Sequence, residues 1–149
     1  MSGGGHWART VRVVESANLV IEVLDARFPD RTRHRGLETM VREKGKKLLL
    51  VLNKADLVKR EKVDEARARL SAEYPCVYLS SKAHEGSNML RGEIERLTEG
   101  GEAKIGVCGY PNTGKSSLIN YLKGRNVAPS SIKAGFTKGE KLVKLSETI

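Results

Sequence analysis

The sequence has few side chains that form disulfides or bind transition metals: two cysteines and three histidines in 149 residues. Cys76 and Cys108 lie in apolar runs and lack the spacing of a metal or redox motif, so we expect buried, reduced thiols. The scattered histidines argue against a zinc site. No apolar run approaches the ~20 residues of a membrane span, and the first residues lack the apolar core of a signal peptide. We therefore expect a cytoplasmic protein with no membrane partner.

Positive charge is in excess, since Lys and Arg outnumber Asp and Glu by 27 to 18 and give a net charge of +9. This balance favours a polyanionic partner such as RNA. Basic residues on solvated helix faces would produce the same balance, so both interpretations stay open. The length, the 39% hydrophobic residues and the 30% charged residues are ordinary for a single folded domain.

Helical and strand-like segments alternate along the chain. Helical spacing and strong helix formers predict helices over residues 6–17, 37–44, 61–73 and 88–98. Short apolar runs predict strands over residues 19–24, 47–53, 76–80, 103–109 and 141–145. This alternation is typical of a three-layer α/β fold, with helices on both faces of a mostly parallel sheet. Ligands of such folds bind outside the carboxyl ends of the strands, where three candidate motifs lie.

The stretch GYPNTGKS at Gly109–Ser116 matches the phosphate-binding loop, between a predicted strand and a predicted helix. Glycines let backbone N–H groups and the helix N-terminus surround phosphates. We expect Lys115 to act in catalysis by neutralising the β and γ phosphates, and Ser116 to hold Mg²⁺. A turn that merely caps a helix explains neither residue. The predicted nucleotide-contacting residues of this segment are Tyr110, Pro111, Asn112, Thr113, Gly114, Lys115, Ser116 and Ser117.

A phosphate loop alone does not separate ATP from GTP, and the segment NKAD at Asn53–Asp56 provides that discrimination. The Asp56 carboxylate can accept two hydrogen bonds from guanine N1 and N2, and it would be left unpaired opposite adenine. We expect Asn53 to fix the loop and the base edge, and the Lys54 stem to lie along the base.

A second base-contacting loop is predicted at the end of the next strand. An ordinary serine-rich turn would explain it equally well if it did not follow NKAD by one strand. Its residues are Ser80, Ser81 and Lys82.

The base-reading motif precedes the phosphate loop, whereas in Ras-like proteins it follows. The two orders are circular permutations, which a parallel sheet permits because its loops share one edge. The chain resembles the circularly permuted P-loop GTPases of the YlqF/YawG kind, which act in ribosome assembly. The resemblance rests on DARFP at 25–29, NKADL at 53–57, SSK at 80–82, GYPNTGKSSLIN at 109–120 and AGFTKG at 134–139.

The resemblance implies a GTPase that acts as a nucleotide-dependent switch, with GTP or GDP and Mg²⁺ as cofactors. A ribosomal subunit or rRNA is the implied partner, and no DNA is expected. Thr137 matches the switch threonine that closes over Mg²⁺ and the γ-phosphate, which assigns it a catalytic role. Asn112 matches a position that ligates K⁺ in potassium-stimulated relatives.

One Ras-like motif, DxxG, is missing, because no Asp is followed by Gly three residues later. We therefore expect residues 1–149 to be a single G domain that is incomplete at its C-terminus, with hydrolysis slow or impaired. The missing strand would lie between the strands at 141–145 and 103–108. Each of these two strands would then have an unpaired edge, which invites dimerisation or swapping.

Two other function classes stay open. The chain could be an ATP-using P-loop kinase or ATPase in which NKAD is coincidental. It could also be a basic RNA-binding module without significant catalysis, and a solvated loop is the alternative to that interpretation. The basic loop in question contains Arg27, Arg31, Arg33, His34 and Arg35.

Overall fold

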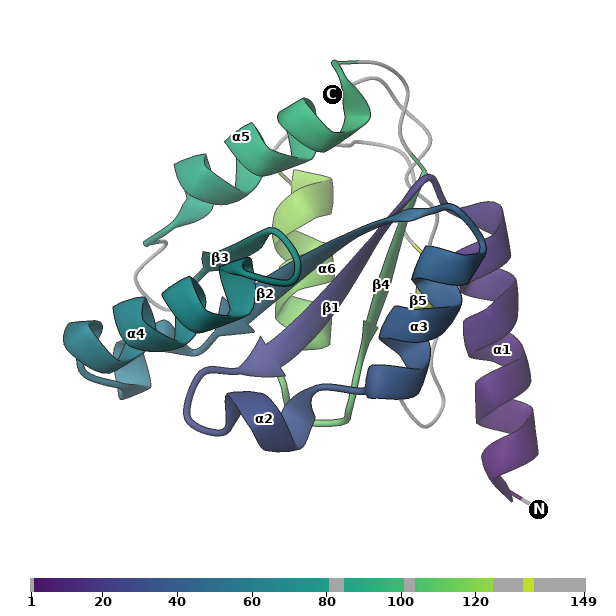
Figure 1. The fold of residues 1–149 in the computed structure, drawn as a ribbon, viewed down its shortest axis with the longest axis horizontal. Helices are drawn as coiled ribbons and strands as arrows, with labels where there is room; N and C mark the ends of the chain where they lie inside the picture. Colours follow the sequence, from purple (N-terminus) through teal and green to yellow (C-terminus); the bar gives the residue numbers. More distant parts are fainter. Residues whose placement is uncertain (1, 81–84, 101–103, 125–132, 136–149) are drawn as a thin grey trace.

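The computed structural model describes residues 2–80, 85–100, 104–124 and 133–135, in which strands and helices alternate (Figure 1). The strands are β1 (Leu19–Asp25), β2 (Lys47–Asn53), β3 (Cys76–Tyr78), β4 (Ile105–Gly109) and β5 (Lys133–Gly135). The helices are α1 (Ser2–Ser16), α2 (Pro29–Thr32), α3 (Arg35–Glu43), α4 (Arg60–Ser71), α5 (Ser87–Thr98) and α6 (Lys115–Gly124), with a 3₁₀ turn, η1 (Ala55–Leu57). The predicted helices and the first four strands are confirmed within a few residues.

The strands form a parallel sheet in the order β3-β2-β1-β4-β5. The chain runs outward from β1 through β2 to β3 and then returns to place β4 on the other side of β1. Strand order therefore reverses between β1 and β4, and in open α/β sheets this point is where ligands bind. The predicted parallel α/β architecture is confirmed.

Two apolar cores cover the two faces of the sheet. Alternate residues of a strand point to opposite faces. Leu19, Ile21 and Val23 of β1 join the core beneath α5 and α6, whereas Val20 and Leu24 join the core beneath α1, α3 and α4. All seven residues of β1 are buried. This two-sided burial explains the nearly continuous apolar run.

The edge of β4 differs from the sequence expectation. Residues Lys133–Gly135 form β5, which pairs in parallel with β4 from Gly106 to Cys108. The prediction of an unpaired edge on this strand is therefore wrong for the described part of the chain. The sequence KAG contains no β-branched or aromatic residue, so it does not indicate a strand. The strand predicted at 141–145 lies outside the described residues.

Both cysteines are buried and free, as predicted. Burial raises the pKa of the Cys76 thiol to about 12, which keeps it protonated. Within the described ranges, no helix is both long enough and apolar enough to cross a bilayer.

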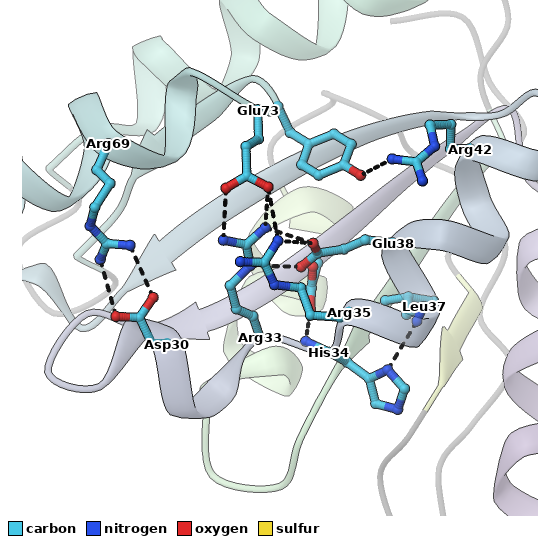
Figure 2. Close-up of polar contacts among 11 residues, drawn as sticks. Asp30, Arg33, His34, Arg35, Leu37, Glu38, Arg42, Arg69 and Glu73 are labelled. Atoms are coloured by element: carbon cyan, nitrogen blue, oxygen red, sulfur yellow. Dashed lines mark hydrogen bonds and ion pairs between the residues drawn. The ribbon is translucent and has the colours of Figure 1, made fainter.

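A charged residue, Glu22, interrupts the apolar run of β1. It is fully buried on the sheet face covered by α1, α3 and α4, and its carboxyl group accepts the backbone N–H of His34 at 2.6 Å. Arg33 and Glu38 form a buried ion pair of 2.7 Å. Figure 2 shows Arg33 between Glu38 and Glu73, so that this ion-pair cluster joins α3 to the segment after α4. Burial, followed by the neighbouring Glu38, raises the pKa of Glu22 to about 9.

The raised pKa of Glu22 predicts a pH-dependent stability. The folded chain keeps this proton up to about pH 9, whereas the unfolded chain releases it above the usual value of 4.5. Unfolding therefore releases a proton between these values, and the free energy of unfolding should fall as pH rises from 5 to 9. One proton contributes at most about 1.4 kcal/mol per pH unit.

Urea unfolding at pH 5, 7 and 9 measures this slope. Glu22→Gln keeps a neutral polar side chain and should flatten it, whereas Glu65→Gln on the exposed surface of α4 should not. An equal slope in wild type and Glu22→Gln would contradict the assignment.

Candidate functional site

The carboxyl edge of the sheet brings together segments that are far apart in the sequence. β1 ends at Asp25, β2 at Asn53 and β4 at Gly109, and Asp25 is the register partner of Asn53. Ser80 follows β3 and is fully buried. The prediction that NKAD, the phosphate loop and the start of the SSK segment share one edge is confirmed.

The phosphate loop, residues 110–114, connects β4 to α6. Thr113 donates its hydroxyl hydrogen to the Tyr110 carbonyl at 2.8 Å, which closes the loop on itself. Lys115 begins α6 and is only 5% exposed, whereas Ser116 and Ser117 in the first turn of α6 are exposed. The backbone N–H groups at a helix N-terminus favour an anion at this position.

A buried hydrogen bond holds NKAD against the phosphate loop. The Asn53 amide nitrogen donates to the Thr113 carbonyl oxygen at 2.9 Å, although the two residues are 60 positions apart in the chain. A Cβ atom on Gly114, where φ is +94°, would lie 1.9 Å from the same amide nitrogen. Glycine at 114 is therefore required both by its backbone angle and by the close approach of Asn53.

A second contact joins the same two segments. The Lys54 ammonium group donates to the Asn112 carbonyl oxygen. Both residues have positive φ angles, 63° for Lys54 and 69° for Asn112. Residues other than glycine seldom adopt this conformation, which costs on the order of 1–3 kcal/mol where it is strained, and such strain is concentrated at functional sites.

Asp25 is a part of the site whose role was not predicted from the sequence motifs. Its carboxylate accepts hydrogen bonds from the backbone and guanidinium groups of Arg27, and it lies 3.6 Å from the Lys54 ammonium group. Burial opposes ionisation, but the hydrogen bonds from Arg27, together with the charges of Arg27 and Lys54, prevail and lower the pKa of Asp25. The signal available in the sequence was its position at the end of the strand that pairs with the NKAD strand.

The Asp56 carboxylate, which is predicted to read the base, is exposed, and a hydrogen bond from Ser80 orients it. Asp56 accepts a hydrogen bond from the buried Ser80 hydroxyl at 2.9 Å, so the serine after β3 is joined to the aspartate after β2. This contact fits the predicted pairing of the two loops. Ser81, Lys82 and Thr137 lie outside the described residues, and their predicted contacts remain predictions.

The predicted basic loop is folded differently from an open RNA-contacting segment. Residues 29–32 form α2, and Arg33 is only 7% exposed, since it pairs with Glu38 and Glu73. Arg35 also pairs with Glu73, at 2.8 Å. Figure 2 shows both guanidinium groups directed toward these carboxylates. Arg33 therefore does not fit the alternative of a basic loop that binds RNA, because its charge is neutralised inside the protein.

The described residues contain no group of three or more His, Cys, Asp or Glu side chains that could hold a metal ion. The donors predicted for Mg²⁺ were the Ser116 and Thr137 hydroxyls together with phosphate oxygens, a set that includes none of those four residue types. The exposed position of Ser116 in the first turn of α6 is compatible with this donor set.

Comparison with known proteins identifies the family to which the chain belongs. The model of the RsgA GTPase family matches residues 8–147. A protein of Methanocaldococcus jannaschii, named as an uncharacterized GTP-binding protein, is 42% identical over 93% of this chain and 37% of its own length. In Arabidopsis thaliana, the guanine nucleotide-binding protein-like NSN1 is 35% identical over 93% of this chain and 29% of its own length.

Nuclear/nucleolar GTPase 2 of the same plant is 35% identical over 96% of this chain and 26% of its own length. The chain thus spans between 26% and 37% of the length of these relatives. The family match extends over both nucleotide-site motifs and nearly all of the sequence, and it shows that this chain belongs to the RsgA GTPase family.

Proposed function

We propose that this chain is the guanine-nucleotide-binding domain of a GTPase that acts as a switch in ribosome assembly. The observation that carries the proposal is the buried hydrogen bond from Asn53 to the phosphate-loop carbonyl of Thr113. It joins a segment that can read the base to a segment that can hold the phosphates. Fixing both ends of one ligand in a single geometry is what selective nucleotide binding requires.

In this proposal the backbone N–H groups of the phosphate loop and the N-terminus of α6 bind the phosphates. Lys115 neutralises their charge, and Ser116 holds Mg²⁺, which bridges the phosphate oxygens. Asp56 accepts the guanine N–H groups, and the Lys54 stem lies along the base.

Two features support the fit of a nucleotide to these residues. The Asn53 side-chain oxygen is buried without a hydrogen-bond partner among the described residues, next to the amide nitrogen that holds the loop. A bound nucleotide could donate a hydrogen bond to this oxygen. A buried acceptor that is left without a partner costs about 1–3 kcal/mol. The glycine at 114 also brings the loop backbone close to NKAD, where a side chain would not fit.

The finer assignment, a circularly permuted GTPase of the YlqF/YawG kind, is supported by the order of motifs in the chain. NKAD at 53–56 precedes the phosphate loop at 109–116. The ribosomal or rRNA partner is supported by the net charge of +9 and by the names of relatives that include nucleolar GTPases. We also propose that this chain is located in the cytoplasm, as its sequence leads us to expect.

Nucleotide binding is better supported than hydrolysis. The sequence contains no DxxG motif, and the proposed switch residue Thr137 lies outside the described residues. The activity that we propose for this domain is slow GTP hydrolysis.

The first prediction from the proposed function concerns the base that the site binds. Calorimetry should show GDP binding at least about 100-fold tighter than ADP, since a site built to hydrogen-bond one base leaves its polar groups unpaired with another. Asp56→Asn should shift the preference toward xanthosine diphosphate, because an amide can donate to the xanthine oxygen. Asp64→Asn, on the exposed surface of α4, should bind GDP like the wild type.

Lys115→Ala should lose binding of both diphosphates, which separates phosphate recognition from base recognition. ADP binding as tight as GDP binding would favour the ATP-using alternative.

The second prediction concerns potassium. GTP turnover should be faster in KCl than in NaCl at equal ionic strength if the Asn112 side chain ligates K⁺. Asn112→Gly tolerates the positive φ but removes the ligand, so it should abolish the difference; Asn112→Asp keeps an oxygen and should retain it. Phosphate release measures turnover, and equal rates of the wild type in both salts would contradict the assignment.

The third prediction concerns the ribosomal partner. The chain loaded with a non-hydrolysable GTP analogue should sediment with ribosomal subunits, and its affinity should fall steeply with salt. Each phosphate contact contributes a slope of about 0.9 or less in log affinity against log salt. In the Lys115→Ala variant, sedimentation with ribosomal subunits should no longer depend on the added nucleotide. A flat salt response would exclude RNA contacts as the source of binding.

A further inference from the structure

Three aromatic rings from separate parts of the chain stack beside the phosphate loop. The ring centroids of Trp7 and His34 are 5.2 Å apart with 17° between their planes, and those of His34 and Tyr110 are 5.9 Å apart with 27°. Trp7 belongs to α1, His34 precedes α3, and Tyr110 is the first residue after β4. This aromatic stack therefore links the amino-terminal helix to the phosphate loop.

His34 takes part in both stacked pairs. Hydrogen bonds hold both its backbone and its imidazole ring. Its backbone N–H donates to the buried Glu22 carboxyl group at 2.6 Å. Its ring Nδ1 accepts the Leu37 backbone N–H at 2.9 Å and caps α3, as Figure 2 shows. A Cβ atom on Gly36 would lie 3.0 Å from the imidazole Cε1. The orientation of the imidazole is thus fixed by β1 and α3, independently of the phosphate loop.

Tyr110 connects the stacked rings to the hydrogen bonds of the phosphate loop. Its carbonyl oxygen accepts the Thr113 hydroxyl at 2.8 Å, and the Thr113 carbonyl oxygen accepts the buried Asn53 amide at 2.9 Å. A ring that stacks on Tyr110 therefore acts on the same short loop that Asn53 holds from the other side.

Trp7 is positioned by the packing of α1 against the strand that leads into the loop. A Cβ atom on Gly106 of β4 would lie 2.6 Å from a Val13 methyl carbon of α1, so helix and strand are in direct contact. Trp7 and Tyr110 are 36% and 38% exposed. Solvent can therefore reach both outer rings of the stack.

We propose that His34 is a positioning residue for the phosphate loop: it stacks on Tyr110, keeps the loop in its nucleotide-binding geometry and couples it to Trp7 of α1. The inference rests on the proposed function, since it assumes that the loop binds nucleotide. It assigns a role to α1 and to the segment before α3, neither of which carries a nucleotide-binding motif.

Two substitutions separate stacking from helix capping. His34→Asn keeps a side chain that caps helices well but removes the ring. His34→Phe keeps a ring but removes the cap. In His34→Asn, the loss of stacking on Tyr110 should weaken GDP affinity about 2- to 10-fold. His34→Phe should stay within about twofold of the wild type.

Trp7 provides a second readout, because it is the single tryptophan of the chain. Its emission should change when GDP is added to the wild type, and the change should disappear in His34→Asn at saturating GDP. Tyr74→Leu is a matched control, since this aromatic residue contacts Arg42 and belongs to neither the loop nor the stack. It should leave both GDP affinity and the emission change unaltered.

The outcomes are distinguishable. Equal GDP affinity in the wild type and His34→Asn would overturn the positioning role, and so would a loss in His34→Phe that His34→Asn does not share. A wild-type chain that binds no GDP in the calorimeter would overturn the proposed function, and this inference with it. Thermal unfolding of each variant confirms that the comparison is made on folded protein.

Discussion

The hydrogen bond from the Asn53 amide to the Thr113 carbonyl is the interaction on which the candidate site depends. Both atoms are buried, so an alternative partner in water is not available to either group when the contact is broken. The contact is possible because β2 and β4 flank β1 in a parallel sheet and end at the same edge. It also explains why no side chain is tolerated at Gly114, where a Cβ atom would occupy the position of the amide.

Electrostatics strengthens the same junction. The Lys54 ammonium group contacts the Asn112 carbonyl and lies 3.6 Å from the Asp25 carboxylate, which Arg27 also holds. Burial acts against the charge of Asp25, but the hydrogen bonds from Arg27 and the charges of Arg27 and Lys54 lower its pKa. Lys54 and Asn112 both sit in the left-handed region of backbone angles. The site therefore combines local backbone strain with contacts between three loops, and the packed sheet beneath holds those loops in place.

A cluster of buried charged residues lies on the face of the sheet beneath α1 and α3. Arg33 is buried between Glu38 and Glu73, and the protonated Glu22 binds the backbone next to it. In the sequence, Arg33 belongs to a run of basic residues that looked suited to RNA. Arg33 is instead buried, and a buried guanidinium group is stable only when carboxylates of the protein pair with it. A glutamate within the apolar run LVIEVLD was the signal that a polar cluster lay under this face.

The sequence by itself determined the alternating strands and helices, the phosphate loop and the placement of NKAD at a strand end, because these depend on local periodicity and short-range spacing. It did not determine which distant groups meet. The contacts of Asn53 with Thr113 and of Asp25 with Lys54, the stacking of Trp7, His34 and Tyr110, and the pairing of β5 with β4 join segments far apart in the chain. Only the tertiary structure decided these, because strand order sets which loops become neighbours, and strand order leaves no local mark on the residues that it brings together.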